Sequence, residues 1–98
     1  MMTLSFERPL QRPQSAVSCY CVEGASDPGL LPRVLELFAK RGLVPERFHA
    51  QPSGHSAEAL VIDLQVRGFN AAEREVVASC LRQIPLVWTV LTSEKVTV

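Results

Sequence analysis

The pattern of apolar and polar side chains and the residue types predict β-strands in three segments of the chain, in part through a period of two where apolar and polar residues alternate. The alternation is clearest over Ala57–Arg67, where one face carries Leu60, Ile62, Leu64 and Val66. Ser15–Glu23 mixes small, β-branched and aromatic residues, which is typical of a strand. Leu86–Leu91 is the last of the three, and we expect it to continue toward Val98.

A fourth strand is predicted over Leu43–Gln51, where Val44, Phe48 and Ala50 alternate with polar or small neighbours. Pro45 has no N–H to donate to a neighbouring strand, so we expect this strand either at an edge of the sheet or with a bulge near Pro45. The residues that follow, Pro52–His55, have the composition of a hairpin turn.

Two other segments show the spacing of amphipathic helices. The first starts near Gly29–Leu30 and ends before Gly42, with Arg33 on its polar face. A glycine is expected directly after a helix, where the backbone takes a positive φ. The second runs from Asn70, an N-cap with a glutamate three positions later, to about Gln83. The two apolar stripes are Leu30, Leu31, Val34, Leu35, Leu37 and Phe38, and Val76, Val77, Cys80, Leu81 and Ile84.

The resulting order, β-α-β-β-α-β, predicts an α+β fold. We expect a ferredoxin-like sandwich of a four-stranded antiparallel sheet with both helices on one face. A length of 98 residues fits a single domain, which we place at residues 15–98. Residues 1–14 contain Pro9 and Pro13 and show neither period, so we expect a flexible N-terminal arm there.

Charge and hydropathy narrow the class of protein. The sequence has 10 Lys+Arg and 10 Asp+Glu, so its formal net charge is zero. Nucleic-acid binders usually carry a basic excess because phosphate neutralisation supplies much of their affinity, so we expect no nucleic-acid partner. The apolar runs are far shorter than the roughly 20 residues of a membrane span, and no signal peptide is evident. We therefore expect a cytoplasmic protein that does not contact membranes.

No catalytic or metal-binding motif stands out. Cys19 and Cys21 lie two positions apart in a predicted strand, and we interpret them as small buried side chains rather than metal ligands. His49 and His55 flank the predicted hairpin without a Cys or carboxylate at ligand spacing. A Ser or Cys nucleophile would need a neighbouring base, and none is indicated. We expect no catalytic residue, no metal and no cofactor.

The segment from Gly24 to Gly29 has the composition of a turn. Pro28 presets φ to about −65° and Gly29 tolerates a positive φ, which together predict a type II turn leading into the first helix. The simplest interpretation is a stable turn and helix start with no further role.

This turn and the helix after it resemble the ACT-domain pattern. In that family a short loop with Asn or Asp and then Pro-Gly opens a helix of the form L-x-x-V-x-x-x-F-x-x-x-G. The chain matches that form at Leu31, Val34, Phe38 and Gly42, and the resemblance spans residues 17–90. Among ACT proteins, the stretch R-V-L-E-L-F-A-K-R-G is most similar to the short small (regulatory) subunit of acetolactate synthase.

The resemblance implies that an amino acid binds between two protomers, at the loop after the first strand. It places Ser26, Asp27 and Gly29 beside the ligand, with Gly29 allowing close approach and Asp27 balancing the ammonium group. The backbone N–H groups of Leu30 and Leu31 would receive the ligand carboxylate.

The same resemblance implies that Val44 and Pro45 of the partner's second strand close the pocket. Ser26 stands where the family's loop carries Asn. Val44 stands where valine-binding members carry Asn, and Pro45 where they carry Ile.

The function implied is that of a non-catalytic regulatory homodimer whose protomers join sheet edge to sheet edge. It would be the amino-acid-binding regulatory subunit of acetolactate synthase, in branched-chain amino acid biosynthesis, with a thiamine-diphosphate-dependent catalytic chain as partner. Two alternatives stay open: a stand-alone ACT homodimer that senses another amino acid, and a small acylphosphatase-like enzyme. The enzyme would need basic groups around a phosphate, whereas the loop Ala25–Leu30 has none and carries Asp27.

Overall fold

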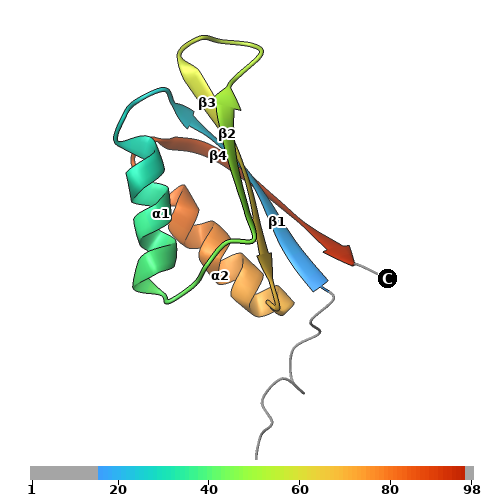
Figure 1. Ribbon diagram of the computed structural model, residues 1–98. Helices are drawn as coiled ribbons and strands as arrows, with labels where there is room; N and C mark the ends of the chain where they lie inside the picture. The colour runs from blue at the N-terminus through green and yellow to red at the C-terminus, as the bar shows by residue number, and fades with distance from the viewer. Residues whose placement is uncertain (1–15, 97–98) are drawn as a thin grey trace, which may run out of the picture.

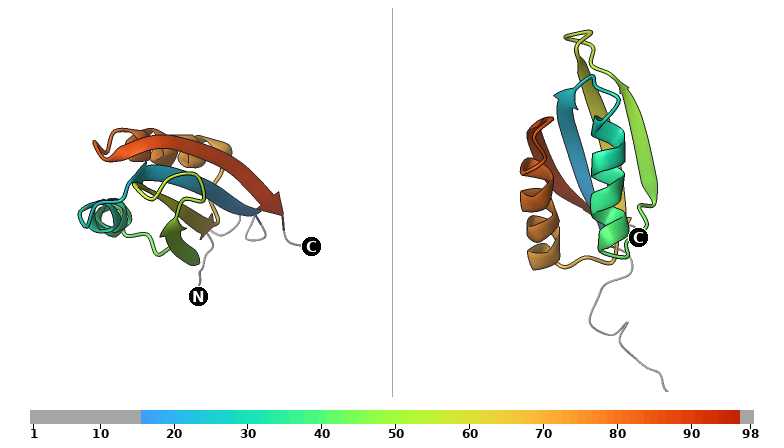
Figure 2. Two further views of the ribbon diagram at one scale, coloured as in Figure 1. Left: turned by 90° about the horizontal axis from the view of Figure 1, so that it is seen from above. Right: turned by 90° about the vertical axis from the view of Figure 1, so that its left-hand side faces the viewer.

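The computed structural model describes residues 16–96, which form one four-stranded antiparallel sheet covered on one face by two helices (Figures 1 and 2). Its elements are β1 (Ala16–Ala25), α1 (Leu30–Lys40), β2 (Arg47–Pro52), β3 (Ala59–Arg67), α2 (Ala71–Arg82) and β4 (Val87–Val96). The strands lie in the order β2-β3-β1-β4, so β1 is central and β2 and β4 form the edges. The predicted ferredoxin-like α+β fold is confirmed. The arm predicted at residues 1–14 lies outside the described residues.

The two faces of β1 differ in burial because only one of them packs on the helices. Ser18, Tyr20 and Val22 are fully buried on the helix side, whereas Cys19 is half-buried and Cys21 is exposed. The prediction that both thiols are buried small side chains is therefore wrong. The alternation of the strand places them on the opposite face of the sheet, because the core side is taken by the residues between them.

Tyr20 connects the centre of the sheet to α2. Its ring lies in the core, and its hydroxyl donates a hydrogen bond to the carbonyl oxygen of Arg74 at 3.0 Å. Burial raises the pKa of the Tyr20 phenol above its usual range; the nearby charge of Arg74 lowers this pKa and that of Glu75 raises it. The phenol therefore stays protonated and keeps its role as a donor.

The predicted helix boundaries at Gly42 and Asn70 are confirmed. Gly42 has a φ of 69°, and the N–H of Leu43 donates to the carbonyl oxygen of Phe38 at 2.9 Å, which is a Schellman-type end. At the start of α2, the Asn70 side chain accepts from the N–H of Glu73, and the Glu73 carboxylate accepts from the N–H of Asn70. This reciprocal pair is a capping box.

The second strand starts later than predicted. β2 begins at Arg47, and Val44 and Pro45 lie in the connection that follows α1. The turn that ends the helix uses the residues directly before them, so sheet pairing begins only where the Glu46 N–H donates to the Gln65 carbonyl oxygen at 2.7 Å. Of the two arrangements expected for this strand, the edge of the sheet is the one observed, although Pro45 itself lies before the strand.

The buried stripes of the helices are narrower than predicted. In α1 the row formed by Leu30, Val34 and Phe38 is buried, but Leu35 is 42% exposed. In α2 Val76 is 50% exposed. The buried residues of α1 form a single row spaced by four, and those of α2 are Val77, Ala78 and Leu81. The apolar residues beside these positions remain exposed and can make other contacts.

A bulge interrupts the pairing of β1 with β4. Glu23 lies opposite Thr89, but Gly24 lies opposite Val87, so Trp88 is an extra residue on β4. Its side chain is 55% exposed.

Gly42→Ala should lower the free energy of unfolding by about 1 kcal/mol, because an L side chain is strained in the left-handed region. No atom lies within 4 Å of the position that the new Cβ would occupy, so the loss measures backbone strain alone. Denaturant unfolding gives the value. Gly54→Ala is the control, since its surroundings are equally open and its φ is not positive; it should change stability by less than about 0.5 kcal/mol. Equal losses at the two positions would contradict the prediction.

Folding stability should fall as the pH rises above about 10, the usual pKa of tyrosine. At such a pH the unfolded chain loses the Tyr20 proton while the folded chain keeps it. Each further pH unit therefore lowers the free energy of unfolding by up to about 1.4 kcal/mol. Denaturant unfolding from about pH 9 to about pH 11 measures the slope, and Tyr20→Phe should remove this part of it. Tyr20 is the only tyrosine, so tyrosinate absorbance should appear only on unfolding. Its appearance in the folded chain would contradict the burial argument.

Candidate functional site

The loop between β1 and α1 is a type I turn, not the predicted type II turn. Gly29 has φ −82° and ψ −8°, so its φ is not positive, and the Leu30 N–H donates to the carbonyl oxygen of Asp27 at 3.0 Å. The reason is local. Gly29 is the N-cap of α1, and the Asp27 carboxylate accepts its N–H at 2.7 Å, which holds the backbone in a helix-like conformation.

The backbone donors at the start of α1 are fewer than predicted. The Leu30 N–H is used inside the turn, and Pro32 has no N–H. The Leu31 N–H has no hydrogen-bond acceptor among residues 16–96. Of the two predicted carboxylate donors, the Leu31 N–H is therefore the available one.

Arg33 borders this loop, a contact that we did not expect from its place on the polar face. Its Nη1 donates to the carbonyl oxygen of Gly29 at 2.9 Å. A Cβ built on Gly29 would lie 2.1 Å from the same nitrogen, so the guanidinium lies directly against the glycine. The spacing of four residues on one helix contained the signal, because such residues are neighbours on the helix surface.

Ser26 and Asp27 are exposed at the end of β1, and the Ser26 N–H donates to the Glu58 carbonyl oxygen at 2.8 Å. This bond fixes the loop to the start of β3. The loop thus offers a carboxylate, a hydroxyl, a guanidinium and one free backbone donor to solvent.

The two halves of the predicted site lie at opposite ends of α1 (Figure 1). The helix has 11 residues, which corresponds to about 16 Å. Ser26 and Asp27 precede it, while Val44 and Pro45 follow it, and the Val44 side chain is 84% exposed. One protomer therefore does not bring these residues together.

Metal-ligand chemistry gives no competing site in the described part of the chain. Residues 16–96 contain no group of three or more His, Cys, Asp or Glu side chains placed to hold a metal ion. His49 and His55 are both exposed.

Within residues 16–96, neither helix has the length and apolar character required to cross a membrane.

A sequence model of the family described as "ACT-like domain" matches residues 11–97 of the chain. The chain belongs to the ACT-like domain family. This family contains regulatory modules that commonly bind amino acids and often dimerise. No curated protein matches the sequence significantly.

Solved structures of other proteins share the fold. The ACT domain from GTP pyrophosphokinase of Chlorobium tepidum is similar with a TM-score of 0.66 and 13% identity, over 79% of this chain and 96% of that domain. The regulatory subunit of aspartate kinase from Thermus flavus is similar with a TM-score of 0.61 and 17% identity, over 82% of this chain and 52% of the subunit. At these identities the likeness concerns the ACT fold alone.

Proposed function

We propose that this ACT domain is a non-catalytic regulatory chain that binds an amino acid between the two copies of a homodimer, as a subunit of acetolactate synthase in the cytoplasm. One observation carries the proposal: the candidate site is split into two exposed halves at opposite ends of α1. A two-fold axis beside α1 would run the partner's helix in the reverse direction. Each loop after β1 would then face the partner's residues that precede β2.

The exposed side of α1 supports such a pairing. Leu31, Leu35 and Ala39 are spaced by four residues and so share one side of the helix, and Leu35 is 42% exposed there. Next to this helix, β2 is an edge strand whose outer backbone groups can pair with a second copy (Figure 2). Joined at β2, two copies would form one continuous eight-stranded sheet.

In the completed site, the Leu31 N–H and the Arg33 guanidinium would receive the ligand carboxylate, and Asp27 would balance the ammonium group. The partner's Val44 and the partner's Pro45 would cover the ligand side chain. Neither has a polar side-chain atom, so polar recognition would rest on the loop after β1.

The proposed catalytic partner is a separate thiamine-diphosphate-dependent chain. A stand-alone homodimer that senses another amino acid is the second candidate, and the replacement of the family's Asn by Ser26 and Val44 favours it. A catalytic-subunit gene beside the gene for this chain would favour the first candidate over the second.

An acylphosphatase-like enzyme is disfavoured because the Asp27 carboxylate already accepts the hydrogen bond of the Gly29 N–H. Substantial hydrolysis of acyl phosphates by the purified chain would overturn the non-catalytic role.

A thermal-shift screen of the twenty amino acids should find one that raises the Tm, by about 4–8 °C for each kcal/mol of binding free energy. Gly29→Asp should abolish this shift, because its carboxylate would displace Arg33 and repel the ligand carboxylate. Aspartate is a favoured N-cap residue, so the fold should persist. Gly54→Asp is the matched control: it adds the same charge on the open hairpin and should leave the shift unchanged.

An equal shift in wild type and Gly29→Asp would place the amino-acid site elsewhere. No shift with any amino acid would overturn amino-acid binding and leave activation of a catalytic chain as the role to test.

Sedimentation at micromolar concentration should give twice the 10.8 kDa mass of the chain. Leu35→Glu should shift the chain to monomers, because it places a charge at the centre of the proposed α1–α1 contact. Val76→Glu is the matched control, since Val76 is similarly exposed but lies on α2. A monomeric wild type, or dissociation by both variants alike, would contradict the proposed interface.

A further inference from the structure

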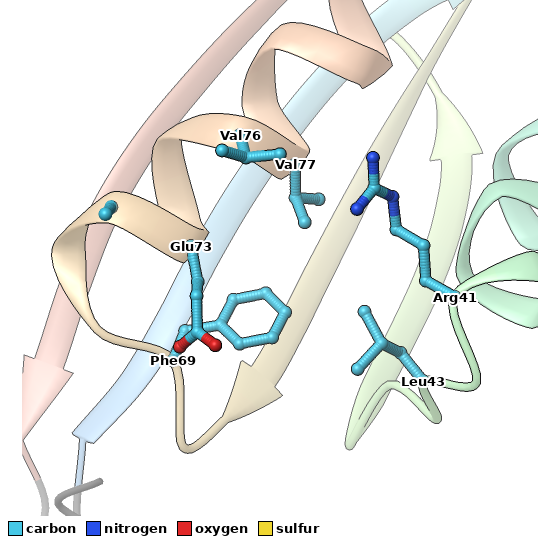
Figure 3. Close-up of a pocket in the computed structure, with 7 residues that line it drawn as sticks. Arg41, Leu43, Phe69, Glu73, Val76 and Val77 are labelled. Carbon is cyan, nitrogen blue, oxygen red and sulfur yellow. The ribbon is translucent and has the colours of Figure 1, made fainter. Parts of the chain in front are cut away.

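A second candidate binding site is a cleft between the end of α1 and the start of α2 (Figure 3). Its volume is about 360 Å³, within the range of small-molecule pockets. The cleft lies at the end of α1 that is opposite the loop after β1, so it is separate from the site described above. Its walls include Arg41, Leu43, Phe69, Glu73, Val76 and Val77.

The floor of the cleft is apolar and firmly packed. Phe69 and Val77 are 4% and 3% exposed and belong to the core. Val76 and Leu43 line the cleft closer to the protein surface and remain partly exposed to solvent. Val76 was expected in the helix stripe that meets the sheet, yet in the structure it forms a wall of this cleft. A ligand with an apolar body would cover it.

Two opposite charges face the cleft from its two sides. Figure 3 shows the Arg41 guanidinium on the α1 side and the Glu73 carboxylate on the α2 side, next to the ring of Phe69. Arg41 donates from Nη2 to the Cys80 sulfur at 3.1 Å, and Glu73 accepts the N–H of Asn70 on Oε1 at 2.9 Å. Both charged groups are thus held in place by the protein before any ligand arrives.

Most N–H donors of the Arg41 guanidinium are available to a ligand. Only one of its five N–H groups is used by Cys80, and no carboxylate among residues 16–96 forms an ion pair with it. In Figure 3 the Arg41 guanidinium and the Glu73 carboxylate lie apart, on different sides of the cleft.

We propose that this cleft binds a small zwitterion with an apolar side chain, in addition to any ligand of the loop after β1. The carboxylate would bond to Arg41, the ammonium group would lie at Glu73, and the side chain would pack on Phe69, Val76 and Val77. A simple anion would be repelled by Glu73, and a simple cation by Arg41. The pair of opposite charges therefore selects a molecule that carries both.

Titration of the labelled full-length chain, followed by the chemical shifts of its backbone amides, tests the proposal. The probes are phenylalanine and leucine, with phenethylamine, hydrocinnamate and glycine as the cation, the anion and the zwitterion without an apolar body. Phenylalanine or leucine should shift the amides of Leu43, Phe69 and Val77 in a saturable way. The three comparison probes should bind at least tenfold more weakly.

Arg41→Gln should weaken this binding at least tenfold. Its matched control is Lys40→Gln, which removes the same charge one residue earlier, from an exposed side chain that is not part of the cleft. Val76→Ser should also weaken binding, and because Val76 is half exposed this change should leave the fold intact.

Three results would overturn the proposal. Hydrocinnamate or phenethylamine binding as tightly as phenylalanine would show that the cleft does not select a zwitterion. If Arg41→Gln and Lys40→Gln weakened phenylalanine binding equally, Arg41 would contribute only to the overall charge of the protein and not a specific contact to the ligand. Shifts confined to Ser26, Asp27 and Gly29 would place the ligand at the other end of α1, and would support the proposed function while removing the second site.

Discussion

The length of α1 is the constraint on which the functional geometry depends. Eleven residues, or about 16 Å, separate the loop after β1 from the turn before β2. One face of the helix is committed to the core through Leu30, Val34 and Phe38, and the candidate ligand-binding groups lie at its two ends. Any site that uses both ends needs a second copy of the chain, whereas a site at one end can be completed within a single protomer.

Both ends of α1 hold their charged side chains in place by short-range hydrogen bonds. At the first end Asp27 and Arg33 both bond to the backbone of Gly29. At the other end Arg41 bonds to Cys80 across the gap between the helices. In each case the charge is oriented before binding, which reduces the conformational entropy that a ligand would have to offset.

The fold and the helix boundaries follow from local rules that the sequence displays directly: alternation in β3, the capping box at Asn70 and the glycine that ends α1. The details of the site were harder to predict. The conformation of Gly29 depends on the Asp27 side chain, which favours a type I turn where composition alone suggested type II. The contact of Arg33 with that glycine, and the exposure of Val76 and Cys21, depend on how the helices and strands are oriented, which a periodic pattern does not specify.

The two aromatic side chains that occur once in the sequence report on different parts of the molecule. Tyr20 lies in the core, while Trp88 lies half exposed at the bulge of the edge strand β4. The intrinsic fluorescence of Trp88 will therefore respond to occupation of the loop after β1, because the residues directly before Trp88 pair with Gly24 and Ala25 at the end of β1. It will change little when the cleft beside α2, at the other end of α1, is occupied. The tryptophan signal during a ligand titration thus distinguishes the two ends of α1, and optical studies of the cleft require a label placed nearer to α2.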